Sequence, residues 1–178
     1  MRGNIIFVSG VHGVGKTTIC NEIKKKENIE AYSSSELIRK YSNEILDAKK
    51  EVNDVSKNQN ILIESIKINV DRENIVLLDG HFVLLKNDHS FENVPLDTFK
   101  NINLAGVIMI VEEAEVISQR LRNRDSKNYD IEVIDRFQNL ELQRAKEVCE
   151  ELNIDIIEFK SGNDINKIIS FINRLKKD

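Results

Sequence analysis

Residues 5–18 read Ile-Ile-Phe-Val-Ser-Gly-Val-His-Gly-Val-Gly-Lys-Thr-Thr. Positions 10–17 match the pattern G-x-x-x-x-G-K-T, directly after an apolar run and directly before a helical pattern. In such a loop the glycines let successive backbone N–H groups face the phosphates of a nucleoside triphosphate, Lys16 reaches the β and γ oxygens, and the Thr17 hydroxyl binds Mg²⁺. The following helix adds the positive end of its dipole. This stretch therefore predicts a strand–loop–helix unit that binds a nucleotide.

The alternative is a loop that keeps the fold and has lost its ligand, but the signature residues of the motif are all intact. The residues expected to contact the nucleotide here are Gly10, His12, Gly13, Val14, Gly15, Lys16, Thr17 and Thr18.

The composition limits what else the chain can be. Its 178 residues, 40% of them hydrophobic and 31% charged, fit one soluble domain spanning 1–178, and no apolar stretch is long enough to cross a membrane. The net charge of −4 gives no general attraction to nucleic acid or to an anionic membrane, so we expect neither as a partner. The two cysteines, Cys20 and Cys149, provide no disulfide framework. We expect both to be packing residues and the compartment to be the reducing cytoplasm.

Short apolar runs alternate with longer amphipathic stretches, which predicts an α/β fold with a parallel sheet covered by helices on both faces. The expected strands are 5–8, a weak one at 29–32, 75–78, 107–111 and 154–159. The expected helices are 16–26, 35–47, 57–70, 114–123, 131–152 and 165–175. Residues 88–103, with the single proline Pro95, show no clear periodicity. They are a surface loop or a short broken helix, and a candidate surface for a partner protein.

A hydroxyl-rich cluster, Tyr-Ser-Ser-Ser-Glu-Leu-Ile-Arg at 32–39, follows the weak second strand. One interpretation is structural, with Ser35 as a helix N-cap and Arg39 on a solvated face. The other is that Ser34 and Arg39 face a second substrate, because an arginine one turn into a helix can bind a phosphate with two hydrogen bonds.

The third expected strand ends in Leu-Leu-Asp-Gly-His at 77–81. An aspartate at the carboxyl end of a strand beside a phosphate-binding loop is placed to hold Mg²⁺ and its waters, so Asp79 is the expected metal-side carboxylate. The alternative for Asp79 is a turn-forming Asp-Gly pair with Gly80. His81 is expected either to orient substrate or carry a proton, or to be a hydrogen-bonded structural histidine.

Arginines cluster after the fourth expected strand, at Arg120, Arg122 and Arg124, and Arg136 follows in the next helix. Positions 120 and 124 share one helix face, whereas 122 points elsewhere. Phosphoryl transfer concentrates negative charge on the moving group, so converging arginines suit that chemistry. The alternative is a helix whose exposed face happens to be basic.

This order of motifs resembles that of the nucleoside monophosphate kinases, and within them the short archaeal-type adenylate kinases and related small ATP-binding kinase-like proteins. The resemblance covers nearly the whole chain. It implies a three-layer P-loop NTPase fold whose five-stranded parallel sheet has the strand order 2-3-1-4-5, with acceptor-binding helices at about 33–70 and a short lid at about 120–131.

The same resemblance implies roles for individual residues. Ser34 corresponds to a hydroxyl donor of the monophosphate site, Arg39 to its phosphate ligand and Arg136 to the arginine of the helix after the lid. The segment 159–163 is similar to the last-strand loop at the adenine, which adds Ser161, Gly162 and Asn163 to the nucleotide contacts. Arg120, at the start of the segment similar to the lid, is a further expected nucleotide contact. The chain departs from the family where bacterial adenylate kinases continue Phe-Pro-Arg after the Asp-Gly pair, because here the sequence is His-Phe-Val at 81–83. One phosphate-binding arginine is therefore missing.

These observations predict an ATP- and Mg²⁺-dependent kinase that transfers the γ-phosphoryl group to a small-molecule nucleotide acceptor, a nucleoside monophosphate. Lys16, Asp79, Arg120 and Arg124 are the expected catalytic residues, Thr17 and Asp79 the metal side, and Ser34, Arg39, His81 and Arg136 the substrate side. A sugar, polynucleotide or other hydroxyl acceptor would instead need Asp79 or His81 as a base. The remaining alternative is an ATP-binding regulatory or interaction module that acts with a partner protein. A monomer and a homodimer both fit the sequence.

Overall fold

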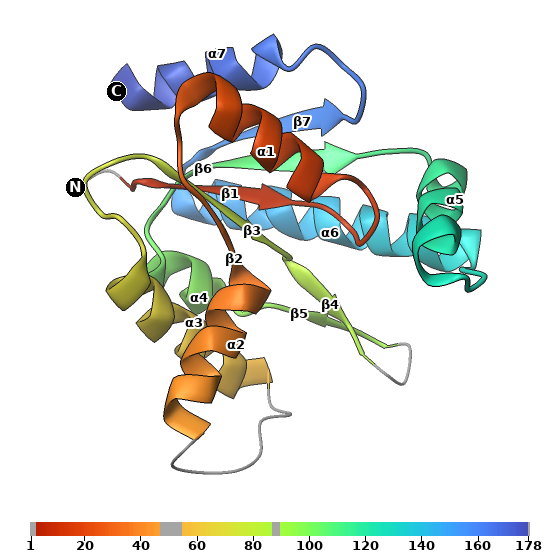
Figure 1. Cartoon of the computed structure of the whole chain (residues 1–178), viewed down its shortest axis with the longest axis horizontal. Coiled ribbons are helices and arrows are strands. Elements are labelled where there is room, and N and C mark those ends of the chain that lie inside the picture. The colour runs from red at the N-terminus through yellow and green to blue at the C-terminus, as the bar shows by residue number, and fades with distance from the viewer. Residues whose placement is uncertain (1–2, 47–54, 87–89, 178) are drawn as a thin grey trace.

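The computed structural model describes residues 3–46, 55–86 and 90–177 and is built around one parallel sheet. Its strands are β1 (Ile5–Ser9), β2 (Ala31–Ser33), β3 (Val76–Gly80), β6 (Leu104–Val111) and β7 (Asp155–Lys160). They pair in the order β2-β3-β1-β6-β7 (Figure 1). Because these are the five expected strands in chain order, the predicted order 2-3-1-4-5 and the α/β P-loop NTPase fold are confirmed.

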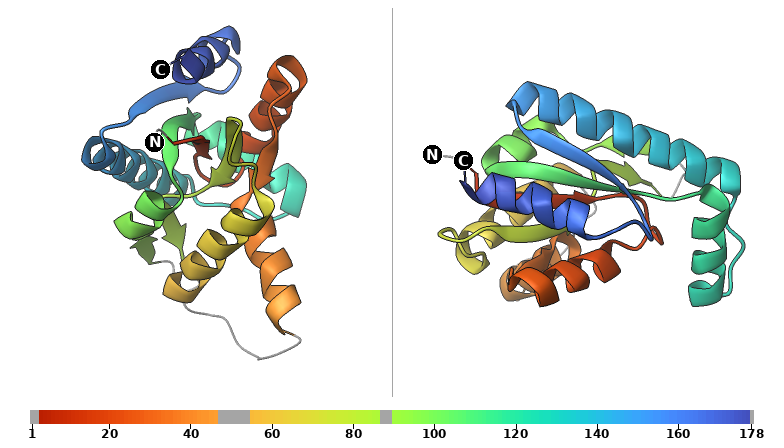
Figure 2. Two further views of the ribbon diagram at one scale, coloured as in Figure 1. Left: turned by 90° about the vertical axis from the view of Figure 1, so that its left-hand side faces the viewer. Right: turned by 90° about the horizontal axis from the view of Figure 1, so that it is seen from above.

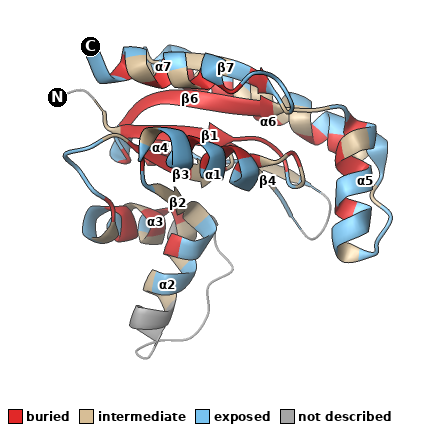
Figure 3. Ribbon diagram, turned by 45° about the horizontal axis from the view of Figure 1, so that its top comes forward, coloured by how far each residue is buried: buried red, intermediate tan, exposed pale blue. Residues whose placement is uncertain are grey.

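The apolar runs of the sequence become the centre of this sheet. Every residue of β1 is buried, and so is β6 except for its last residue (Figure 3). Strands covered on both faces need apolar side chains throughout, which explains why 5–8 and 107–111 are continuous rather than alternating. The edge strand β7 is largely exposed or half-buried, as its mixed sequence requires.

Helices cover both faces of the sheet (Figure 2). Helices α1 (Lys16–Glu27) and α7 (Asn166–Lys177) lie on one face, and the long α6 (Ile131–Leu152) lies on the other. Helix α5 (Ala114–Asp125) stands at the end of the sheet where β1 and β6 finish (Figure 1). Helices α2 (Ser34–Leu46) and α3 (Val55–Asn69) pack together beside β2 and β3. Among the described residues, none of the helices has the length and apolar character needed to cross a membrane.

Helix α6 shows how the sequence sets one of these elements. It begins after Asp130, whose side chain accepts a hydrogen bond from the Glu132 N–H, and it ends at Asn153 in a left-handed conformation. Its buried side is formed by Ile134, Phe137, Glu141, Ala145, Val148 and Cys149. The spacing of three and four residues is that of an amphipathic helix, but one member of the stripe is a carboxylate.

The prediction of a surface loop or a short broken helix for 88–103 is correct in part over the described residues, because a short helix is present and a short strand precedes it. Here the chain forms β5 (Phe91–Asn93), paired antiparallel with β4 (Val83–Leu85), and then the short helix α4 (Leu96–Asn101). Pro95 stands immediately before α4, where a fixed φ suits helix entry and no N–H is needed. Elements of three and six residues are too short to show a period, so their sequences carry no clear signal. Residues 88 and 89 lie outside the described part of the chain.

Candidate functional site

The loop 10–17 has the backbone of a phosphate cradle. Gly10, Gly13 and Gly15 have φ angles of 144°, 81° and 109°, which side chains with a Cβ rarely adopt. A Cβ on Gly10 would also lie 2.5 Å from the carbonyl oxygen of Ile110 in β6. Helix α1 begins at Lys16, as predicted, and no side chain caps its first N–H groups. These donors and the positive end of the helix dipole are therefore directed to the mouth of the loop, where they suit an anion.

Lys16 is folded back across this loop. Its Nζ donates to the carbonyl oxygen of Gly10 at 2.5 Å and lies 3.4 Å from Nε2 of His81 and 3.9 Å from Oδ1 of Asp79. Burial lowers the pKa of Lys16, and Asp79 opposes that shift. The ammonium thus joins the loop to the end of β3, the two segments that the sequence predicted to work together.

Asp79 lies inside β3 and not in a turn, so the turn-forming alternative is wrong. It pairs in register with Val8 in β1, directly before the loop. A Cβ on Gly80 would lie 2.5 Å from the ring of Phe7 and 2.8 Å from Oγ of Ser34, so close packing requires the glycine. Burial raises the pKa of Asp79 and Lys16 opposes this.

Thr17 and Asp79 both line the same cavity, which has a volume of about 810 Å³. A hydroxyl and a carboxylate are the hard oxygen donors that Mg²⁺ prefers, and Mg²⁺ commonly takes its other ligands from water and phosphate oxygens. The residues present therefore fit Mg²⁺ bound together with a nucleotide.

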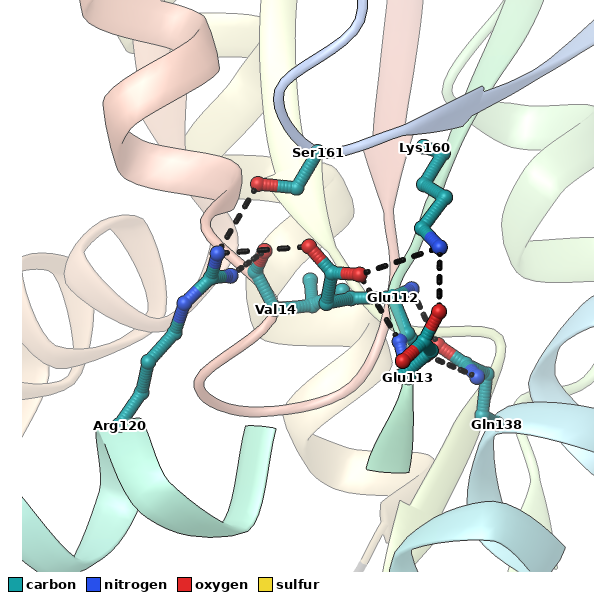
Figure 4. Close-up of polar contacts among 7 residues, drawn as sticks. All are labelled: Val14, Glu112, Glu113, Arg120, Gln138, Lys160 and Ser161. Atoms are coloured by element: carbon teal, nitrogen blue, oxygen red, sulfur yellow. Dashed lines mark hydrogen bonds and ion pairs between the residues drawn. The ribbon is translucent and has the colours of Figure 1, made fainter. Parts of the chain in front are cut away.

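Arg120 connects the segments around the loop (Figure 4). From α5 its guanidinium donates to the carbonyl oxygen of Val14 at 3.0 Å and to Oγ of Ser161 at 3.3 Å, and it lies 3.4 Å from a carboxylate oxygen of Glu112. Lys160 ties the same carboxylate to the end of β7. Ser161 and its neighbours Gly162 and Asn163 also line the cavity, as predicted from the last-strand loop.

Of the other three arginines predicted after the fourth strand, only one lines the cavity. Arg124 lines the cavity, and both its Nε and its Nη2 donate to the carboxylate of Asp125 at 2.6 Å. Arg122 and Arg136 are exposed and are not among the lining residues. Arg136 lies over the ring of Phe91, 5.4 Å from its centre, so the structure does not bring it to the predicted substrate side.

The cavity wall has two sides, one with charged side chains around the loop and one with apolar and uncharged polar side chains. The P-loop side consists of 11–13, 15–18, Arg120, Arg124 and 161–163, whereas Gly10 and Val14 of the predicted nucleotide contacts do not line the cavity. The apolar side carries the hydroxyls and amide of Ser33, Ser34, Ser35, Gln59 and Thr98, and the apolar residues Phe7, Ile38, Leu62, Leu84, Val94, Phe99 and Ile102. Asp79 and His81 line the cavity as well and come from the end of β3 and the residue after it.

The hydroxyl cluster is part of the apolar side. Oγ of Ser34 is buried and has no hydrogen-bond partner among the described residues, while Oγ of Ser33 and Oγ of Ser35 lie 3.0 Å apart. Helix α2 starts at Ser34, so Ser35 lies in its first turn and is not the residue before the helix. Arg39 is exposed and does not line the cavity. Of the predicted acceptor pair, only the serine reaches the site.

Two histidines meet beside Lys16. The rings of His12 and His81 are 4.5 Å apart, and both line the cavity. Desolvation of the partly exposed ring, together with the nearby His81, Lys16 and Arg124, lowers the pKa of His12 to about 4, so the ring is neutral at pH 7.

Sequence reasoning missed Glu141, which is fully buried beneath these histidines. Oε1 accepts a hydrogen bond from the Ser9 hydroxyl, and the two oxygens accept from the backbone N–H groups of Phe82 at 2.9 Å and Val83 at 2.6 Å. The signal was a glutamate on the apolar stripe of α6, a position where an unpaired charge would be too costly.

Both cysteines are buried, and burial raises the pKa of each thiol to about 12. A thiol that stays protonated is a poor nucleophile, so these positions act as packing residues.

The parallel sheet with a phosphate-binding loop at the end of β1 defines a nucleotide-binding protein with the P-loop kinase fold. A model of the AAA domain family matches residues 9–138, more than half of the chain, and the chain belongs to this family. A search of curated proteins finds no significant match. Among solved structures, a gluconokinase from Sinorhizobium meliloti 1021 is similar with a TM-score of 0.53 and 12% identity. The match covers 96% of this chain and 90% of the gluconokinase chain, and at this identity it shows a shared fold.

Proposed function

We propose that this protein is an ATP-dependent kinase that phosphorylates a hydroxyl group of a small-molecule acceptor. The observation that carries the proposal is the division of charge in the cavity. The lysine and arginines that line it among the described residues, Lys16, Arg120 and Arg124, all lie on the P-loop side. The triphosphate can therefore bind to cations. On the apolar side, the acceptor molecule can contact hydroxyl groups and apolar side chains.

The residues of the P-loop side divide the work of binding the donor. The loop N–H groups and Lys16 hold the phosphates, and Arg120 and Arg124 approach the transferred group from α5. Thr17 and Asp79 would hold Mg²⁺, which would neutralise negative charge on the phosphates. Burial strengthens the contact of Lys16, because water screens it less, whereas the side chains of Arg120 and Arg124 are exposed to solvent.

The apolar side supports an acceptor with an uncharged body. An unpaired buried hydroxyl such as that of Ser34 has a hydrogen bond to give to a ligand. Ile38 and Leu84 on this side are half-buried, so an apolar ligand surface that covers them is stabilised by removing the remaining apolar area from water. A monophosphate would instead bring two negative charges next to Asp79.

The nucleoside monophosphate acceptor remains the second candidate, favoured by the 32–39 segment and its Arg39. For that role the exposed side chain of Arg39 would have to enter the cavity. The gluconokinase that shares the fold acts, by its name, on gluconate, so a sugar acid is a third acceptor class worth testing.

The test measures ADP formation from Mg-ATP with nucleoside monophosphates, neutral sugars and alcohols, and gluconate, and then examines the product by phosphorus NMR. Stimulation by a hydroxyl compound, with a phosphate monoester as product, supports the proposal. Stimulation by a monophosphate alone, with a phosphoanhydride as product, overturns it. ADP formation that is indifferent to every acceptor points to an ATP-binding module. The Lys16→Met variant is the control for contaminating kinases.

A further inference from the structure

Glu141 is surrounded by polar groups from two separate parts of the chain. It accepts hydrogen bonds from the Ser9 hydroxyl and from the N–H groups of Phe82 and Val83. Nδ1 of His81 lies 3.6 Å from its Oε1, which is too long for a hydrogen bond, and this buried nitrogen has no hydrogen-bond partner among the described residues. Glu141 is thus the carboxylate that faces Nδ1. A carboxylate is a pure acceptor, whereas a protonated acid or an amide would direct at least one hydrogen at another donor. The site is therefore built for the charged form of Glu141.

The charged form also agrees with the balance of forces on the carboxylate. Burial by itself would raise the pKa of Glu141, but the interactions with His81, Ser9 and Phe82 outweigh burial and lower it. Glu141 is thus ionised at neutral pH and faces Nδ1 of the imidazole with an acceptor.

The other nitrogen of the imidazole, Nε2, faces a hydrogen-bond donor. Nε2 of His81 lies 3.4 Å from Nζ of Lys16, which can only donate. A neutral imidazole has one N–H donor and one nitrogen acceptor. With an acceptor beside Nδ1 and a donor beside Nε2, the arrangement favours one tautomer, in which Nδ1 carries the hydrogen and Nε2 carries the lone pair.

The ring has little freedom to leave this arrangement. His12 from the loop lies 4.5 Å from it, and Phe137 from α6 stacks on it at 6.1 Å with an angle of 20° between the rings. The backbone on the carboxyl side of His81 is held as well, because Glu141 bonds the next two N–H groups.

We propose that Glu141 is a positioning residue that fixes His81 with its Nε2 lone pair toward the cavity, where this nitrogen accepts a hydrogen bond from the acceptor's hydroxyl group. The second half of the proposal rests on the proposed function. Lys16 satisfies Nε2 in the present structure. When Lys16 contacts phosphate oxygens instead, this lone pair is released next to the apolar side. A hydroxyl held there has its oxygen turned toward the nucleotide, which is the orientation that transfer requires.

Nitrogen NMR tests the tautomer without any need for an acceptor. In the protein labelled with ¹⁵N-histidine at about pH 8, well above the usual histidine pKa, His81 should show a protonated Nδ1 and an unprotonated Nε2. The His81→Gln spectrum assigns the signals among the three histidines of the chain. Glu141→Gln should change the tautomer ratio, whereas Glu150→Gln, on the exposed side of the same helix, should not. A wild-type His81 with its hydrogen on Nε2 would overturn the inference.

Kinetics with the hydroxyl acceptor test the contact itself. The glutamine side chain can place an oxygen near the position of Nε2, but asparagine reaches only that of Nδ1. His81→Gln should therefore keep kcat/KM for the acceptor about tenfold or more above that of His81→Asn, the equivalent of one hydrogen bond. Equal values for the two variants would overturn the contact. Glu141→Gln should lower kcat by a similar factor with little change in the KM for ATP, and a change in the KM for ATP alone would contradict positioning.

The two parts of the proposal can fail separately. If no acceptor of any class is phosphorylated, the proposed function and the hydroxyl contact fall together. The NMR result still decides the role of Glu141. If the Glu141→Gln protein does not fold, the wild-type tautomer and the His81 pair carry the decision.

Discussion

On the P-loop side of the cavity, Gly13, Gly15, Lys16 and Thr17 come from one short segment, 10–17, whereas the apolar side is assembled from β1, β2, α2, α3, β4, α4 and their connections. The first side binds a ligand part, the triphosphate, that is the same in many proteins. The second must fit a molecule particular to this protein, and no single motif describes such a wall. A sequence can therefore name the donor of a reaction while it leaves the acceptor open.

The largest effect on activity is expected from a substitution on the P-loop side, that of Lys16. Lys16→Met should lower kcat/KM about 100- to 1000-fold, because the charge that acts on the phosphates is lost in a buried setting. The free energy of unfolding without nucleotide should change by no more than about 1 kcal/mol, since the burial cost of the ammonium offsets its contacts. Steady-state kinetics and urea unfolding measure the two quantities. A large loss of stability would mean that Lys16 holds the fold and not the ligand.

A smaller effect is expected where α5 meets the loop. Arg120→Ala should raise the KM for ATP about tenfold, because the guanidinium contacts Val14 and Ser161 beside the loop. Arg122→Ala is the matched control, two residues away on the same helix and exposed. Initial rates at varied ATP separate the variants. Equal effects of both would indicate a diffuse electrostatic role for α5 and no specific contact.

His12 in the phosphate loop should make the free energy of unfolding depend on pH. Its folded-state pKa of about 4 lies below the unfolded value of about 6.5, so the unfolded chain takes up the proton first as the pH falls. Stability is therefore lost between about pH 6.5 and pH 4. Because solvent screens the partly exposed ring, we expect His12→Asn to lose about 1 kcal/mol less than the wild type between pH 7 and pH 5. Urea unfolding at both pH values provides the comparison, and identical losses would contradict it.

The smallest effect tests the apolar side. Arg39→Ala should change the acceptor KM by about twofold at most, because an exposed side chain outside the cavity wall makes no contact to lose. Kinetics at saturating ATP measure it. A rise of tenfold or more in the acceptor KM, with the KM for ATP unchanged, would favour a nucleoside monophosphate as the acceptor.

The same division explains how much of the molecule was predictable. The strands, the start of α1 and the bounds of α6 followed from apolar runs and helical periodicity, which are local signals. The order of the strands followed from the resemblance to a known family. The β4–β5 hairpin was missed, and α4 was expected only as one of two alternatives, because these elements are too short to show a period. At the site, the sequence predicted the loop and Asp79, but whether Arg39 points in or out depends on how α2 packs.

Glu141 marks the limit of pattern reading. A glutamate among Phe137 and Ala145 on the buried side of α6 was visible in the sequence as a break in the apolar stripe. Its partners were not, because Ser9 is 132 residues away and the N–H groups of 82 and 83 belong to no motif. Such a residue is identified only when the packing of the helix against the sheet is known.

The reach of Glu141 also has a consequence for the order in which the site is built. During synthesis the phosphate loop and the end of β3 are made long before residue 141, so both remain without their shared carboxylate until α6 docks on the sheet. Contacts across such a separation in the chain form late, because closing a long loop costs entropy before the contact rewards it. The phosphate loop, 10–17, is thus completed only when α6, which is synthesised much later, packs on the sheet. We therefore expect nucleotide binding to require nearly the whole fold.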